Sequence, residues 1–242
     1  MKISGSTDIG LCRSENQDGF DYGFFDDGTS WAVVCDGMGG ANGGQIASKM
    51  VVDIVGKKIN LCYNKAMELF SFENIFLSSI VTANVCVYDR SSFDEDLRGM
   101  GTTIVAAMVK NSRACIAHVG DSRVYKVSSD SIQQLTKDHS LAQEMLDSGQ
   151  ISQLEFENYP RKNIITRAIG VGEKVDVDFN FTDITEGEAL ILCSDGLSGL
   201  LSAEEIHKIY NETEFSSLAD KYIQIANEKG GYDNITVVIM KG

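Results

Sequence analysis

The pattern of apolar and polar residues predicts strands at the start of the chain and then a pair of helices. Apolar and β-branched residues favour short strands near residues 3 to 9, 20 to 26 and 30 to 36. Asp26-Asp27-Gly28 separates the last two and predicts a structural hairpin, because Asp-Gly is a strong hairpin signal. Two apolar stripes at helical spacing follow, and each is interpreted as a core face. They consist of Ile46, Met50, Ile54 and Val55, and of Ile75, Phe76, Ile80, Ala83 and Val87.

The middle of the chain reads as a run of strands with turns between them. Residues 102 to 109 and 113 to 119 flank one turn, and residues 123 to 127 and 132 to 135 flank another. We predict that these four strands form an antiparallel meander. Residues 140 to 157 predict one or two short helices. Val175, Val177, Phe179 and Phe181 then alternate with polar neighbours, which indicates a strand with one solvated face.

The last third of the chain completes an α+β pattern. Ser202-Ala203-Glu204-Glu205 is a capping box that starts a helix, a second helix is predicted over 217 to 229, and a strand over 235 to 240. Helix pairs therefore alternate with runs of strands. This order predicts a four-layer αββα sandwich of two antiparallel sheets flanked by helix pairs, rather than a parallel βαβ fold. The single proline and the lack of a Ser/Pro-rich tract predict one domain over residues 1–242.

Composition limits the classes of partner. The chain has 242 residues, of which 43% are hydrophobic, enough for one substantial core. A net charge of −14 would repel nucleic acid and anionic lipid, so neither is expected as a partner. The first residues lack an apolar signal core, and the longest apolar run, 104 to 109, is too short to span a bilayer. We therefore expect a cytoplasmic protein without membrane association, and a monomer.

The cysteines and histidines do not indicate a metal site. The six cysteines (12, 35, 62, 86, 115 and 193) stand singly, without a Cys-x-x-Cys pair, which favours reduced and buried thiols. None of the three histidines, at 118, 139 and 207, has metal-ligand spacing with another, so a zinc site is not expected.

Five aspartates at the ends of apolar strand-like runs are the candidate chemistry. They are Asp18, Asp36, Asp121, Asp195 and Asp233. Asp-Gly is also an ordinary turn signal, but Asp36-Gly37 is followed by further glycines and a helical pattern instead of a partner strand. Its carboxylate therefore needs another explanation.

Carboxylates gathered from several strands favour hard divalent cations such as Mg²⁺ or Mn²⁺. Their mutual repulsion is relieved when two or more cations bind. A two-metal site activates a water and stabilises an in-line displacement at phosphorus, which indicates phosphoester hydrolysis. Arg13 lies five residues before Asp18, and its guanidinium could hold a phosphate bidentately.

Eight short motifs occur in order along the chain. They are Arg13-x-x-Asn16-Gln17-Asp18, Asp36-Gly37-Met38-Gly39-Gly40, Met100-Gly101-Thr102-Thr103, Gly120-Asp121-Ser122-Arg123, Asp138-His139-Ser140, Thr166-Arg167-Ala168-Ile169-Gly170, Ser194-Asp195-Gly196 and Gly231-Tyr232-Asp233-Asn234. These motifs resemble those of metal-dependent (type 2C) serine/threonine phosphatases of the bacterial type. The resemblance spans residues 4 to 240 and implies an αββα sandwich. It also implies hydrolysis of phosphoserine and phosphothreonine in proteins by a metal-activated bridging water, with Mn²⁺ or Mg²⁺ as cofactor.

The resemblance also implies the metal ligands. Asp36 matches the aspartate that bridges the two catalytic ions, and Gly37 matches the residue whose carbonyl binds the second ion. Asp195 and Asp233 match the remaining ligands of the first ion. Asp121 matches a ligand of a third, weaker ion, which Asp195 would share.

Three further residues are implied to support the metals and the phosphate. Asp18 matches a carboxylate that holds metal-bound water, Arg13 matches the phosphate-binding arginine, and Asn234 would orient Asp233 or a water. Residues 141 to 170 match a variable flap beside the active site. The expected partners are phosphoproteins, including a bacterial Ser/Thr kinase whose action the enzyme reverses.

Two positions depart from the animal-type pattern. Met38 stands where a histidine often follows the Asp-Gly, so no side chain is assigned as the acid that protonates the leaving seryl oxygen, and a metal-bound water could serve. Gln17 stands where glutamate is common before Asp18, which predicts a weaker contact to metal-bound water. His139 is interpreted as structural, since a lone histidine in a helix-start motif more often is.

Three other functions are weighed against this one. A catalytically inactive relative that only binds phosphoproteins would have lost ligand aspartates, yet all five are present. A nucleotide-binding protein using residues 37 to 44 would need a glycine-rich phosphate motif that is absent there. A cysteine-based phosphatase would need an arginine six residues after a cysteine, and no cysteine has one.

Overall fold

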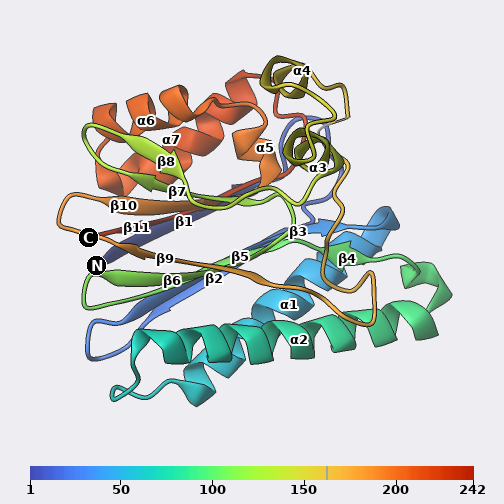
Figure 1. Cartoon of the computed structure of the whole chain (residues 1–242), viewed down its shortest axis with the longest axis horizontal. Coiled ribbons are helices and arrows are strands. Elements are labelled where there is room, and N and C mark those ends of the chain that lie inside the picture. Colours follow the sequence, from blue (N-terminus) through green and yellow to red (C-terminus); the bar gives the residue numbers. More distant parts are fainter. Residues whose placement is uncertain (162) are drawn as a thin grey trace.

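The computed structural model describes residues 1–161 and 163–242, without the side chains of residues 41, 42 and 157. Within this part of the chain, two antiparallel sheets lie face to face, and helices cover both outer faces (Figure 1). The predicted four-layer αββα sandwich is therefore confirmed. The first sheet has the order β1 (Lys2–Asp8), β11 (Ile235–Lys241), β10 (Ala189–Cys193), β7 (Arg123–Val127) and β8 (Ile132–Gln134).

The second sheet is built around the strand that ends in Asp36-Gly37. Its order is β2 (Asp18–Phe24), β3 (Ser30–Met38), β5 (Ile104–Lys110), β6 (Arg113–Val119) and β9 (Asp178–Asp183), and the short β4 (Gly101–Thr102) also pairs with β3. The predicted hairpin at residues 26–28 connects β2 and β3, and Gly28 takes a φ of 84° there. Glycine suits this position because other residues are strained at positive φ.

Two helix pairs form the outer layers. In Figure 1, α1 (Gly40–Cys62) and α2 (Leu69–Phe93) cover the second sheet, while α6 (Ala203–Glu212) and α7 (Phe215–Glu228) cover the first. The predicted capping box is present, since Ser202 and Glu205 exchange both of its hydrogen bonds at the start of α6. The short helices α3 (Leu141–Asp147) and α4 (Gln153–Glu157), α5 (Asp195–Ser198) and the 3₁₀ turn η1 (Glu95–Leu97) lie in the connections.

Three apolar layers hold the sandwich together, and β3 contributes to two of them. Trp31, Val33 and Cys35 pack toward α1 and α2, whereas Ala32 and Val34 pack between the sheets. Because alternate residues of a strand point to opposite faces, a strand buried on both sides must be apolar almost throughout. This explains the unbroken apolar run that precedes Asp36.

The predicted core face of α2 is buried, and the predicted Val55 of α1 is buried as well, but the centre of the buried face of α1 lies one residue beyond the other predicted positions. Ala47, Val51, Val55 and Ile59 of α1 are fully buried, and the predicted Ile46, Met50 and Ile54 pack at the edge of the same cluster. The shift arises because α1 contacts both the sheet and α2, so two adjoining faces of the helix are covered.

Helix α2 is apolar and long enough to cross a membrane by length and composition, and it is the single helix of this kind in the described part of the chain. Here one face of it packs into the core with Phe72, Phe76, Ile80 and Val87. The sequence-based search for apolar runs missed it because polar residues interrupt the run.

The predicted meander is wrong as a single unit. The four strands form two hairpins, β5–β6 and β7–β8, that belong to different sheets. The chain crosses between the sheets at residues 120–122, where Gly120 has a φ of 110°. The apolar pattern could not show this crossing, because strands of both sheets are buried in similar surroundings.

Two smaller predictions also need correction. The strand predicted from Val175 begins only at Asp178, although Val175 and Val177 still pack against the core. Cys35, Cys115 and Cys193 are buried as predicted, but Cys12 and Cys86 are exposed and Cys62 is half-buried.

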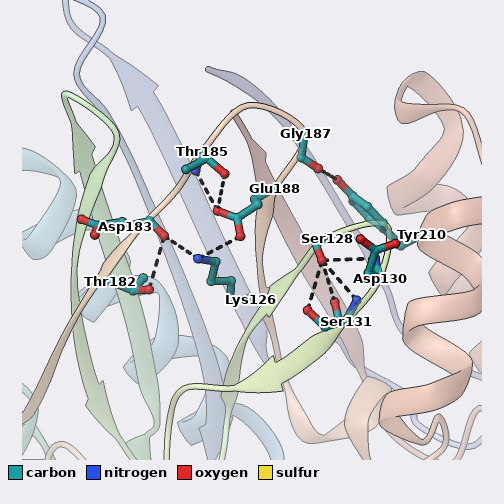
Figure 2. A network of polar contacts seen from close by, with 10 residues as sticks. All are labelled: Lys126, Ser128, Asp130, Ser131, Thr182, Asp183, Thr185, Gly187, Glu188 and Tyr210. Atoms are coloured by element: carbon teal, nitrogen blue, oxygen red, sulfur yellow. Dashed lines mark hydrogen bonds and ion pairs between the residues drawn. The ribbon is translucent and has the colours of Figure 1, made fainter.

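A polar network links the two sheets at the end near the chain termini (Figure 2). The Lys126 ammonium of β7 donates to the Asp183 carbonyl at 2.8 Å and pairs with Glu188 at 2.9 Å. Glu188 in turn accepts from the Thr185 N–H at 2.8 Å, which closes the turn between β9 and β10. The C-terminal ends of β3 and β10 lie at the opposite end of the sandwich, where α5 begins (Figure 1). Asp36 is near the end of β3, and Asp195 begins α5 directly after β10.

Candidate active site and metal centre

The sandwich brings six of the eight predicted site residues to one cavity of about 540 Å³, whereas Asp18 and Asp121 are not among the residues that line it. Strand pairing places Asp18 directly opposite Asp36. From the side of the other sheet come Asp195, just after β10, and Asp233 and Asn234, just before β11. The cavity is lined by Arg13, Ser14, Glu15, Gln17, Asp36, Gly37, Met38, Gly39, Gly40, Asn163, Asp195, Asp233 and Asn234. Residues that are more than two hundred positions apart in sequence thus face the same space.

The backbone at Asp36-Gly37 is held by hydrogen bonds to Thr102 and Thr103 and lies close to the backbone of α1. The Asp36 N–H donates to Thr103 Oγ1 at 3.0 Å, and the Asp36 carbonyl accepts from the Thr103 N–H at 2.9 Å and from Thr102 Oγ1 at 2.8 Å. A Cβ on Gly37 would lie 2.1 Å from the Gly44 carbonyl oxygen. Glycine is therefore required here by close approach of the α1 backbone.

The aspartates of the site are buried close together, so their ionised carboxylates repel one another. Burial, followed by the charges of Asp18, Asp195 and Asp121, raises the pKa of Asp36 well above its usual value. Burial is also the largest cause that raises the pKa of Asp18 to about 7 and that of Asp121 to about 8, and it raises the pKa of Asp195. A cation at this position would relieve the repulsion and favour the ionised forms.

The donor set fits hard cations with water ligands. Asp18 Oδ1 and Asp195 Oδ1 are buried and have no hydrogen-bond partner among the described residues. Within the same residues, no three His, Cys, Asp or Glu side chains are grouped closely enough to hold an ion by themselves. Mg²⁺ and Mn²⁺ retain several waters and accept backbone carbonyls, so an open arrangement of a few carboxylates suits them.

Asp18 links the two sheets beneath the cavity. Its Oδ2 accepts from Ser194 Oγ at 2.7 Å, and Ser194 Oγ accepts from the Thr236 N–H at 3.0 Å. Asp18 begins β2 in the second sheet, whereas Ser194 directly follows β10 and Thr236 lies in β11 of the first. The other oxygen of Asp18, Oδ1, is buried without a partner among the described residues, and Asp18 is paired with the cavity-lining Asp36.

Arg13 and Asp233 form an ion pair at the rim. Arg13 Nη2 donates to Asp233 Oδ2 at 2.7 Å, and the two side chains are 54% and 36% exposed. The hydrogen bond to Asp233 is the largest of the contacts that raise the pKa of Arg13. The guanidinium therefore lines the cavity with a permanent positive charge beside the carboxylates.

Asn234 makes contacts that the sequence did not indicate. Its Oδ1 accepts from the Gln17 N–H at 2.8 Å, and its Nδ2 donates to the carbonyls of Ile9 and Glu15, both at 2.9 Å. The hydrogen bond to Asp233 Oδ1 comes instead from the Asn234 backbone N–H, at 2.8 Å. The side chain thus holds the loop of residues 9–17 that carries Arg13.

A second cavity, of about 310 Å³, adjoins the first. Asp195 and Asn163 line both cavities, and Asp121 lines the second. Arg123 and Asp138, which also line it, form a bidentate ion pair with Nη2 to Oδ2 at 2.6 Å and Nε to Oδ1 at 2.9 Å. Sequence reasoning gave this pair no role, although both residues lie inside the recognised motifs.

His139 is held on both sides of its ring. Nδ1 accepts from the Gly120 N–H at 3.0 Å, and Nε2 lies 3.2 Å from Asp178 Oδ2. The ring also stacks on His118 at 4.4 Å between centroids. These contacts agree with a structural role for His139.

Comparison with known proteins places this arrangement in a family. A model for Protein phosphatase 2C matches residues 13–238. The chain belongs to the protein phosphatase 2C family. It is a protein-serine/threonine phosphatase of the bacterial type, as its motifs predicted.

The relatives match over nearly their whole length. The serine/threonine phosphatase stp of Listeria innocua is 39% identical over 247 residues, which covers 100% of this chain and 96% of that protein. The serine/threonine phosphatase structure from S. agalactiae has a TM-score of 0.92 at 37% identity, covering 100% of this chain and 99% of that one.

The catalytic domain of the phosphatase PstP, in complex with two manganese ions, has a TM-score of 0.83 at 28% identity and covers 98% of this chain and 96% of its own. Together with the family match, this neighbour supports metal-dependent catalysis in this phosphatase.

Proposed function

We propose that this phosphatase hydrolyses phosphoserine and phosphothreonine in proteins with two Mn²⁺ or Mg²⁺ ions at the base of the larger cavity. The observation that carries the proposal is the convergence of Asp36, Asp195 and Asp233 on one cavity beside the Arg13 guanidinium, where Asp195 Oδ1 is buried without a partner among the described residues. When bound, the ions would supply an acidified water as the nucleophile and stabilise charge on the phosphate.

The residues divide by role in this proposal. Asp36 would hold both ions, with the Gly37 carbonyl on one side and Asp195 and Asp233 on the other. The position of Asp36 is fixed before binding, because its N–H and its carbonyl are both hydrogen-bonded to Thr103. A preorganised ligand stabilises the reacting state without reorganisation during the reaction.

Arg13 and Asp18 would act on the phosphate and on water. The Arg13 guanidinium lies at the rim, where it can exchange its contact with Asp233 for a phosphate oxygen. Asp18 keeps one oxygen on Ser194, and its buried Oδ1, which has no partner among the described residues, would accept a hydrogen bond from water. Asn234 would keep Arg13 in reach by holding its loop.

The smaller cavity would hold a third, weaker ion between Asp121 and Asp195. Both side chains line it, and Asp195 also lines the larger cavity. We further propose that the chain acts as a single cytoplasmic phosphatase unit, active as a monomer. Its substrates would be phosphoproteins, including a bacterial Ser/Thr kinase.

Phosphate release from a phosphothreonine peptide tests the proposal. Wild-type protein should hydrolyse the peptide with Mn²⁺, and EDTA should abolish turnover. Asp195→Ala should lower kcat by about 100-fold or more, because a shared ligand of the proposed ions is lost. Undiminished turnover by this variant would contradict the metal assignment.

Asp27→Asn is the matched control. Asp27 also precedes a glycine after a strand, but it lies in the β2–β3 hairpin, where its carboxylate accepts from the Thr29 N–H at 3.1 Å. Its replacement should leave kcat within about twofold, as for surface changes away from the site.

A further inference from the structure

Helix α2 buries one amide whose hydrogen bonds all leave the helix. Asn84 is 1% exposed. Its Oδ1 accepts from the Gly170 N–H at 2.8 Å, and its Nδ2 donates to the carbonyls of Gly172 at 2.9 Å and Glu173 at 3.3 Å. By contrast, the buried Ser79 on the same helix donates to the Phe76 carbonyl of its own helix at 2.9 Å.

The partner of Asn84 is the segment that leaves the predicted flap. Residues 169–173 run from the end of the flap (141–170) toward β9. Gly170 has a φ of 86°, and a Cβ there would lie 2.2 Å from Val87 Cγ1 of α2. A buried amide without partners costs free energy. Asn84 is therefore explained within the apolar face of α2, because its side chain supplies hydrogen bonds to backbone groups of residues 170–173 that pack against the helix.

The same segment is bonded to the backbone behind the metal ligands. The Ile169 N–H donates to the Thr102 carbonyl at 2.8 Å, and the Thr102 N–H donates to the Ile169 carbonyl at 3.0 Å. Thr102 is in turn paired with Gly37 in the β3–β4 ladder, and its Oγ1 donates to the Asp36 carbonyl at 2.8 Å. Three backbone segments, around residues 37, 102 and 169, thus lie side by side.

We propose that Asn84 is a positioning residue for the phosphatase reaction. It anchors the outermost of these three segments, and through Ile169 and Thr102 it fixes Asp36 and the Gly37 carbonyl. The same anchor sets where the flap leaves the site. The catalytic consequence rests on the proposed function, whereas the anchoring of residues 169–173 does not.

A structural residue and a positioning residue differ in what their loss changes. Loss of a purely structural contact lowers the melting temperature and leaves Mn²⁺ affinity unchanged. Loss of Asn84 should instead loosen the Asp36-Gly37 backbone, so that metal affinity and the exchange of flap-exit amides change as well. Because three hydrogen bonds are lost, we expect Mn²⁺ affinity and amide exchange each to change by about tenfold or more.

The experiment compares Asn84→Ala with Ser79→Ala. Ser79 is equally buried and lies on the same helix, but its hydroxyl donates to the Phe76 carbonyl within that helix, so it serves as the matched control. Mn²⁺ binding is measured by calorimetry, and backbone hydrogen exchange is measured over residues 100–103 and 165–173. Asn84→Ala should weaken Mn²⁺ binding about tenfold and speed exchange at Gly170 and Ile169 by at least that factor. Ser79→Ala should change neither.

The inference is overturned if Asn84→Ala matches Ser79→Ala in Mn²⁺ affinity and in exchange, even where its melting temperature is lower. Should Asn84→Ala fail to fold, Asn84→Asp takes its place, because it loses the two hydrogen bonds from Nδ2 to the carbonyls of Gly172 and Glu173. Weaker Mn²⁺ binding than in Ser79→Ala is then the expected result, and equal binding overturns the inference. Wild-type protein that binds Mn²⁺ but leaves the phosphopeptide intact counts against the proposed function alone. The exchange measurement on Asn84→Ala then still decides the anchoring.

Discussion

Replacing Asn234 with alanine should release the loop that carries Arg13. The change removes three hydrogen bonds, to the Gln17 N–H and to the carbonyls of Ile9 and Glu15. At roughly 1 kcal/mol each, they hold the loop by about 3 kcal/mol. This corresponds to roughly a hundredfold change in the equilibrium between the held and the released loop.

The loss should appear in substrate binding more than in global stability. A surface loop can open locally without global unfolding. The free energy of unfolding should therefore fall by less than the roughly 3 kcal/mol expected from the three lost hydrogen bonds. KM for a phosphothreonine peptide should rise toward the value of Arg13→Ala and not beyond it, because the released loop loses only that clamp. Mn²⁺ affinity should be retained, since the N–H that contacts Asp233 belongs to the backbone.

A double-mutant cycle checks the reasoning. If Asn234 acts through Arg13, the double variant should have the KM of Arg13→Ala alone, and the two effects should be far from additive. Asn211→Ala is the control, because its amide also holds a loop carbonyl, that of Ser129 at 3.0 Å, on an exposed part of the surface. Additive effects on KM, or a KM unchanged in Asn234→Ala, would refute the assigned role of the amide.

The remaining predictions concern pH, the glycine of the metal loop and the thiols. Burial raises the pKa of Asp18 to about 7 and of Asp121 to about 8. The stability that these two groups contribute to metal-free protein is therefore fully present below about pH 4 and lost as pH rises to 7 and 8. Because cations bind the ionised carboxylates, the gain in melting temperature on adding Mn²⁺ to EDTA-treated protein should be larger at pH 8 than at pH 5, and an equal gain would count against this electrostatic account. Gly37→Ala would place a Cβ 2.1 Å from the Gly44 carbonyl oxygen, so calorimetry should detect no Mn²⁺ binding at concentrations that saturate wild type, whereas Gly28→Ala, in open space, should bind normally. A thiol reagent should modify the exposed Cys12 and Cys86 quickly in native protein, and the buried Cys35, Cys115 and Cys193 only on unfolding. Mass spectrometry of the modified peptides measures this order, and faster modification of the buried thiols would contradict the prediction.

The candidate site was recognisable from sequence where a short motif carries its own chemistry. Asp36-Gly37 and Asp195-Gly196 each follow an apolar strand, and the structure brings both aspartates to one cavity. The Asp27-Gly28 control was also interpreted correctly, because two strand-like runs flank it and the structure has a hairpin there. In each case the neighbouring residues within one strand or turn were enough to decide.

The contacts that support the site were not recognisable. Asn234 was assigned to Asp233, its neighbour in sequence, but its amide bonds to residues 9, 15 and 17. Asn84 lies next to Ala83 of the predicted apolar stripe, and the sequence assigned it no role. Hydrogen bonds between positions so far apart leave no local signal, since any asparagine has the same donors and acceptors.

The sequence by itself determined the element types and the αββα class, because strand and helix periodicity and turn chemistry are local properties, and its motifs predicted which residues would bind metal and phosphate. Only the tertiary structure decided that β5–β6 and β7–β8 belong to different sheets. It also decided which aspartate oxygens are buried without partners and which amides hold the Arg13 loop and the flap exit. These properties depend on which surfaces face each other after packing, and apolar residues pack in many arrangements that a linear pattern does not distinguish.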